Sequence, residues 1–149
     1  MTTTNLQLPT YNGAAEVRQL ASLGERLLGQ IIDGFIAVIP VIVVAILPWG
    51  SSFGVQQTAQ SIAIAVTLSY LLFSDGFEAG QSFGKRAMNT AVVDRITNEP
   101  CTFGQSFIRN ILLLVLGFID WIFIFGEKRQ RLGDKAAGTV VITTQPEPD

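Results

Sequence analysis

The sequence has no histidine and a single cysteine, Cys101, among its 149 residues. One cysteine excludes an intrachain disulfide. Without histidine there is no serine–histidine or cysteine–histidine pair for nucleophilic catalysis, and no cysteine–histidine cluster for a metal. Proton chemistry near neutral pH would fall to carboxylates with altered pKa values. These absences argue against an enzyme, and they predict neither a resident metal nor a cofactor.

Charge is also scarce. Charged residues make up 15% of the chain, against about 25% in a typical soluble domain. Hydrophobic residues make up 48%, and the mean hydropathy is +0.41. The few basic residues lie beside apolar segments, which argues against nucleic acid as a partner. We therefore expect one domain of the all-α integral membrane class, in contact with membrane lipids.

Apolar residues are concentrated in three segments. The first, from about Leu27 to Leu47, is long enough for a hydrocarbon core of about 30 Å. The second, from about Ser61 to Phe73, is shorter, with Gln56 and Thr58 as a potential extension. The third runs from Phe107 to Phe125. We predict two transmembrane helices from the first two.

The positions of lysine and arginine indicate whether the third segment crosses the membrane. The loop between the first two segments has no lysine or arginine, and three other regions share all ten. The positive-inside rule places those regions in the cytoplasm. Residues 90–94 and 139–143 are predicted strands, which can pair only on one side of a membrane. We therefore favour a broken or re-entrant third segment, hinged near Gly117 to Asp120. Three full spans are the alternative.

The remaining organisation follows from composition. Residues 1–15 are predicted to form a polar N-terminal arm, residues 16–145 the membrane domain and residues 146–149 an acidic tail. Within the domain, Glu16 to Glu25 alternates apolar and polar residues at helical spacing, which indicates an N-terminal interfacial helix. The strand pairing is expected to form a small cytoplasmic β-structure, with both termini cytoplasmic.

Asp33 lies inside the first apolar segment, where an ionisable side chain costs about 2.5–3.5 kcal/mol. Its carboxylate could bind a cation or a proton, or it could belong to a buried ion pair, and the residue pattern leaves both open. Asp120 is a second carboxylate in an apolar segment. If the two face each other, they repel unless a proton or a cation lies between them.

Basic residues beside the apolar segments are predicted to contact anionic lipid headgroups. Gly80 to Arg86 invites a comparison with a phosphate-binding loop, but three residues separate its glycines where that loop has four. The predicted headgroup residues are Lys85, Arg86, Arg109, Lys128 and Arg129.

Three stretches together resemble the RDD family of small bacterial membrane proteins, named for one arginine and two aspartates. They are Leu20 to Asp33, Gly80 to Arg86 and Arg131 to Val141. The resemblance implies that Arg26, Asp33 and Asp134 are the name-giving residues and form a charge network. The chain departs from the family pattern at two positions. Gly133 stands where members often have histidine, and Phe83 stands where they often have proline.

The resemblance implies a multi-pass protein of the bacterial inner membrane and leaves two functions open. One is monovalent cation/proton antiport, with Asp33 and Asp120 as the exchange sites in a homo-oligomer. The other is a non-transporting membrane module that binds lipid or a membrane-protein partner, with the arginine and aspartates structural.

Overall fold

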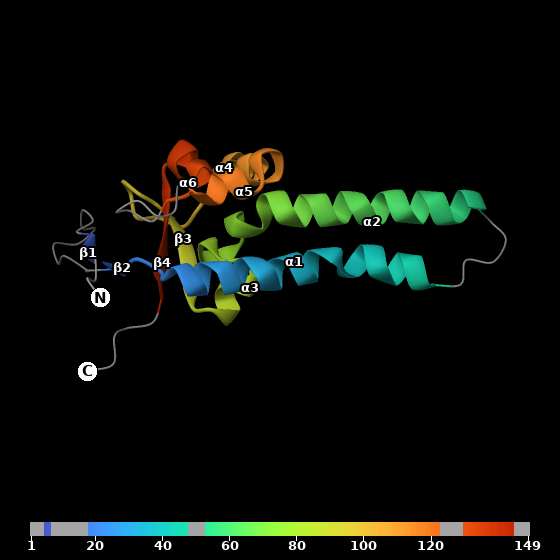
Figure 1. Ribbon diagram of the computed structural model, residues 1–149, viewed down its shortest axis with the longest axis horizontal. Coiled ribbons are helices and arrows are strands. Elements are labelled where there is room, and N and C mark those ends of the chain that lie inside the picture. The colour runs from blue at the N-terminus through green and yellow to red at the C-terminus, as the bar shows by residue number, and fades with distance from the viewer. Residues whose placement is uncertain (1–4, 7–17, 48–52, 123–129, 145–149) are drawn as a thin grey trace.

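A computed structural model describes residues 5–6, 18–47, 53–122 and 130–144 of the chain. Within these ranges the protein is mostly helical, with two long helices, several short ones and two small antiparallel sheets (Figure 1). The elements are β1 (Asn5–Leu6), β2 (Arg18–Gln19), α1 (Leu23–Ile46), α2 (Phe53–Phe73), the 3₁₀ turns η1 (Ser74–Gly76) and η2 (Glu78–Gly80), α3 (Phe83–Ala87), β3 (Thr90–Asp94), α4 (Phe103–Leu116), α5 (Phe118–Ile122), α6 (Leu132–Ala137) and β4 (Thr139–Thr143).

Helix α1 begins at a capping box. The Ser22 side chain accepts a hydrogen bond from the Glu25 amide at 3.2 Å, and Glu25 accepts one from the Ser22 amide at 2.7 Å, so two amides that the first turn leaves unpaired are satisfied. The predicted interfacial helix from Glu16 to Glu25 is wrong for residues 18–22, whereas residues 23–25 form the first turn of α1. Residues 18–19 form β2, and Leu20 makes a β-bridge with Ile142 instead of a helical turn. A short alternating pattern fits an extended segment equally well.

Helices α1 and α2 run side by side as a hairpin whose far half projects beyond the rest of the protein (Figure 1). They have 24 and 21 residues, so α2 begins before the predicted start and includes the suggested extension. Apolar side chains on this half are exposed, among them Phe35 at 71% and Ile46 at 75%. Within the described ranges, α1 is the one helix long and apolar enough to cross a membrane.

Pro40 lies inside α1 without ending it. A proline within a helix disturbs the hydrogen bonds of the preceding turn, so carbonyls there need other donors. The Thr67 hydroxyl of α2 donates to the Ala37 carbonyl at 2.6 Å. This bond lies in the turn before the proline and joins the two helices of the hairpin.

The predicted pairing of residues 90–94 with 139–143 is confirmed. Strands β3 and β4 are antiparallel, with Val92 opposite Val141 and Val93 opposite Val140. Apolar side chains on both faces are buried, and Val92 and Val140 are fully so. This sheet is the main apolar core of the end of the molecule that carries the short helices.

The third apolar segment is broken where the sequence predicted. Helix α4 ends at Gly117, which has a positive φ of 54°, and α5 follows at once. Glycine suits this position because side chains disfavour positive φ. Helix α4 is about 21 Å long at 1.5 Å per residue, shorter than the hydrocarbon core. Helix α6 then packs back against α4.

Candidate functional site

Eight buried charged side chains gather where the α1–α2 hairpin meets the short helices and the β3–β4 sheet. None is more than 9% exposed. Four are basic and four are acidic, so the set is balanced. We call it the charge cluster: Arg26, Lys85, Arg109, Arg131, Asp33, Asp75, Asp120 and Asp134.

Asp134, in the first turn of α6, is the point where three arginines meet. Its carboxylate pairs with Arg26, lies 2.8 Å from Nη2 of Arg109 and accepts a hydrogen bond from the Arg131 amide at 3.2 Å. Burial alone would raise the pKa of Asp134, but the charges of Arg109, Arg131 and Arg26 outweigh it and hold the pKa well below its usual range. The geometry thus includes the predicted contact between Arg26 and Asp134.

Asp33 fixes α1 to a different set of partners. It accepts hydrogen bonds from the Tyr70 hydroxyl at 2.7 Å, the Gly84 amide at 2.8 Å and the Ser82 hydroxyl. Nζ of Lys85 lies 3.7 Å from its Oδ2. The carboxylate therefore joins α1, α2 and α3 through three hydrogen bonds and one ion pair.

The predicted charge network of Arg26, Asp33 and Asp134 thus contains two groups without a direct contact between them. Arg26 binds Asp134 on α6, whereas Asp33 binds α2 and the α3 region. Seven residues separate Arg26 from Asp33, which is about 10.5 Å along the helix axis. That separation lets the two side chains of one helix serve different neighbours.

Gly84 allows α3 to approach α1 closely enough for its amide to reach Asp33. A Cβ at Gly84 would lie 2.1 Å from the Gly29 carbonyl oxygen and 2.8 Å from Cγ of Asp33. Both glycines lie in the buried contact between these helices. Gly84, one of the two glycines that invited comparison with a phosphate-binding loop, thus allows close helix packing.

Asp75 joins the two groups, and the sequence analysis assigned it no role. Its carboxylate lies 2.5 Å from Nζ of Lys85 and 3.6 Å from Nε of Arg109, and it accepts from Asn110 at 3.1 Å. Burial would raise the pKa of Asp75, but Lys85 and Arg109 lower it well below its usual range. One feature of the sequence could have indicated this role. An acidic residue directly follows the second apolar segment, and the nearby basic residues had been assigned no acidic partner.

Two of the residues predicted to contact lipid headgroups are instead buried inside the protein. Lys85 and Arg109 are 8% and 1% exposed, because the carboxylates of Asp75 and Asp134 draw them inward. Arg86 is exposed and lies 3.5 Å from Glu78. Lys128 and Arg129 lie outside the described residues.

Asp120 binds the chain that returns after the broken segment. It accepts from the Gly133 amide at 2.7 Å and lies 3.7 Å from Nε of Arg131. It shares none of these partners with Asp33, so the structure does not bring the two carboxylates together around one ion. A Cβ at Gly133 would lie 2.3 Å from the Arg109 carbonyl oxygen, so α6 packs against α4 where a histidine side chain would not fit.

The chain matches a described protein family over most of its length. The model of the RDD family covers residues 20–138. The chain belongs to the RDD family. The matched range contains the whole charge cluster, and RDD proteins are membrane-associated. This agrees with the exposed apolar surface of α1.

Similar proteins occur in two species of Mycobacterium. Proteins called proline-rich antigen homolog, from two strains of Mycobacterium tuberculosis, are 30% identical over 95 residues, which is 59% of this chain and 40% of theirs. The proline-rich antigen of Mycobacterium leprae is 32% identical over 96 residues, 60% of this chain and 39% of that protein. The match thus spans about two fifths of these longer relatives. No solved structure gives a significant match.

Proposed function

We propose that this RDD protein is a non-transporting membrane module that binds lipid or a membrane-protein partner, and that its charge cluster is structural. In this proposal the α1–α2 hairpin crosses the bacterial inner membrane, and the end with the sheet and short helices lies in the cytoplasm with both termini. The relatives support a module, because the matching region forms only part of their length.

The environment of Asp33 carries the proposal. A carboxylate has about four acceptor sites, and Asp33 already faces three hydrogen-bond donors and the Lys85 ammonium. A bound monovalent cation would have to displace several of them. The described residues also contain no group of three or more acidic, cysteine or histidine side chains placed to hold a metal ion. Cation/proton antiport in a homo-oligomer therefore has less support than a structural role.

The test is cation-dependent proton movement in proteoliposomes, with wild type, Asp33→Asn and Tyr70→Phe compared. We expect no exchange above that of protein-free liposomes for any of them. Asp33→Asn should instead lower the unfolding temperature, since it weakens acceptance from Ser82, Gly84 and Lys85. Tyr70→Phe removes one hydrogen bond and should lower it less. Exchange by wild type that a folded Asp33→Asn protein loses would overturn the proposal in favour of antiport.

A further inference from the structure

Aromatic rings gather where α2 ends, at the base of the hairpin. The ring centroid of Tyr70 lies 6.2 Å from those of Phe77 and Phe83, and Phe77 contacts Phe103 of α4 at 6.2 Å. The three phenylalanines are exposed. Because α2 ends at Phe73, the rings lie at the level where a membrane-crossing hairpin leaves the hydrocarbon, a level that aromatic side chains often occupy.

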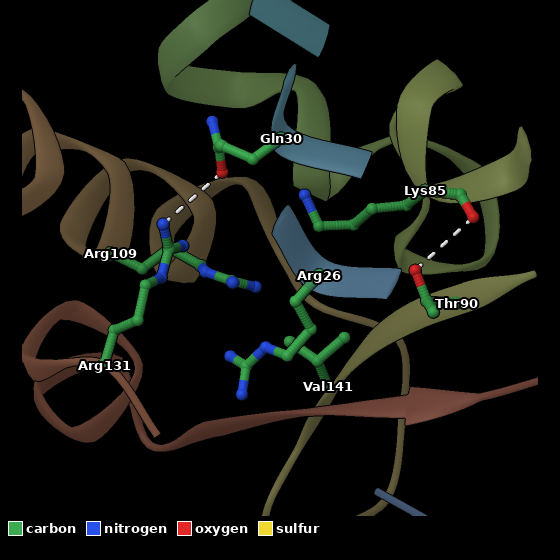
Figure 2. A pocket seen from close by; sticks show the side chains of 7 residues that line it. All are labelled: Arg26, Gln30, Lys85, Thr90, Arg109, Arg131 and Val141. Carbon is green, nitrogen blue, oxygen red and sulfur yellow. Dashed lines mark hydrogen bonds between the residues drawn. The ribbon is translucent and has the colours of Figure 1, made fainter. Parts of the chain in front are cut away.

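A pocket opens beside these rings. It is lined by Phe77, Glu78, Gln81, Phe83 and Arg86. Its volume is about 180 Å³, well above the roughly 10–15 Å³ that one water molecule needs. The cavity inside the charge cluster, drawn in Figure 2, measures about 10 Å³ and has room for about one water. The pocket beside the rings can therefore hold a group of several heavy atoms, which that cavity cannot.

The sheet fixes one wall of this pocket. Gln81 donates through Nε2 to the Thr90 carbonyl at 3.0 Å. Gly80 packs so closely that a Cβ would lie 2.1 Å from the Val92 carbonyl oxygen. Ala79 has a φ of 60°, a conformation that alanine rarely adopts and that often occurs where a ligand-binding segment is held in place. The turn between α2 and α3 is thus positioned before any ligand binds.

The pocket lining includes one acid and one base. Glu78 and Arg86 lie 3.5 Å apart, and their side chains are 90% and 46% exposed. An exposed ion pair contributes little to stability, so both side chains can turn to a ligand at low cost. A guanidinium binds phosphate oxygens with paired hydrogen bonds, whereas a carboxylate and neighbouring ring faces attract an ammonium group. The lining therefore matches a ligand that carries both a phosphate and an ammonium.

We propose that this pocket binds the headgroup of a zwitterionic phospholipid whose ammonium carries N–H donors, as in phosphatidylethanolamine. Arg86 binds the phosphate, and Glu78 with the rings of Phe77 and Phe83 binds the ammonium. The methylated ammonium of phosphatidylcholine has no N–H to donate to Glu78, and phosphatidylglycerol has no cation for it. The inference deepens the lipid-binding part of the proposed function and rests on the hairpin crossing the membrane.

Glu78→Gln is the sharpest variant, because it keeps the size of the side chain and removes the charge that attracts the ammonium. In detergent without lipid this variant should unfold close to wild type, since the ion pair of Glu78 with Arg86 is exposed. Glu99→Gln is the matched control. It removes the same charge from an exposed residue that does not line the pocket.

The experiment is thermal unfolding of the full chain in nanodiscs. Three bilayers are compared: phosphatidylcholine alone, and phosphatidylcholine mixed with either phosphatidylethanolamine or phosphatidylglycerol. We expect phosphatidylethanolamine to raise the unfolding temperature of wild type and of Glu99→Gln by about 2–4 °C over phosphatidylcholine, which a several-fold excess of lipid over its dissociation constant would give. Glu78→Gln should lose most of this rise, and phosphatidylglycerol should give a smaller rise to wild type.

Three results would overturn the assignment of this pocket. The first is an equal unfolding temperature of wild type in phosphatidylethanolamine and phosphatidylcholine. The second is an equal rise for wild type and Glu78→Gln, which would reflect the bilayer and not the pocket. The third is a larger rise with phosphatidylglycerol, which would indicate an anionic lipid at Arg86. All three leave the structural role of Asp33 intact, because ion flux tests that role separately.

Discussion

The two ends of the α1–α2 hairpin contrast sharply. At the base, polar and charged side chains are buried and paired, with Asp134 and Asp33 each bound by several donors. On the far half, large apolar side chains such as Phe35 and Ile46 are exposed. Extended exposed apolar surface needs an apolar partner or solvent. Contacts within the protein thus stabilise the base of the hairpin, whereas the far half requires an apolar environment around it.

The largest effect is expected from Asp134→Asn. The change removes the charge that three buried arginines share, and breaking a buried ion pair costs about 3–5 kcal/mol. Chemical unfolding in detergent measures the loss. Glu78→Gln is the matched control, because its ion pair with Arg86 is exposed and should contribute at most about 1 kcal/mol. Equal losses of unfolding free energy for the two variants would contradict the difference between the buried and the exposed ion pairs.

The glycine contact between α1 and α3 comes next. Gly84→Ala places a Cβ 2.1 Å from the Gly29 carbonyl oxygen, so α3 must move away from Asp33, at a cost of about 1–3 kcal/mol. Gly34→Ala is the control on the same hairpin, because nothing lies within 4 Å of a Cβ there. That control should be neutral or slightly stabilising. The measurement is the unfolding free energy of the two variants. A Gly84→Ala protein as stable as wild type would mean that α1 and α3 are not in close contact.

Acid should destabilise the base through Asp75 and Asp134. The pKa values of both are lowered in the folded protein, so their contribution to stability is present above the unfolded pKa of about 3.9 and is lost as pH falls through the folded values. Unfolding curves should therefore show stability falling below about pH 4. Asp134→Asn should show a shallower fall, and an unchanged pH dependence would assign the effect to other carboxylates.

Much of this base could be predicted from sequence, and the reasons differ from element to element. The β3–β4 pairing and the break at Gly117 follow from local patterns and charge counting. The start of α1 at Leu23 was not predicted, although Ser22 and Glu25 have the spacing of a capping box. The helix predicted from residue 16 was wrong because Leu20 is held by a bridge to Ile142, a tertiary contact that local alternation does not contain.

Side-chain direction was the part that sequence could not supply. Lys85 and Arg109 flank apolar segments, as headgroup residues do, and only the three-dimensional position of Asp75 and Asp134 turns them inward. Likewise, Asp33 and Asp120 were both acidic residues in apolar segments. The chain path places one against α3 and the other against Gly133.

The smallest effect is expected on the far half of the hairpin. Phe35→Ala removes a side chain that is 71% exposed and packs little against the protein, so the unfolding free energy in detergent should change by no more than about 0.5 kcal/mol. Val92→Ala, in the buried sheet, should cost more in the same assay. A large loss for Phe35→Ala would show that the far half packs against a further protein surface, such as a second copy of the chain.

The central claim is that the Asp33 carboxylate is held by protein donors and does not exchange ions. The infrared band of this carboxylate, identified as the signal that Asp33→Asn removes, tests it most directly in reconstituted protein. Adding sodium or lithium at constant pH and ionic strength should leave the band unchanged. A cation-dependent shift that disappears in Asp33→Asn would show ion binding at this site and contradict the account.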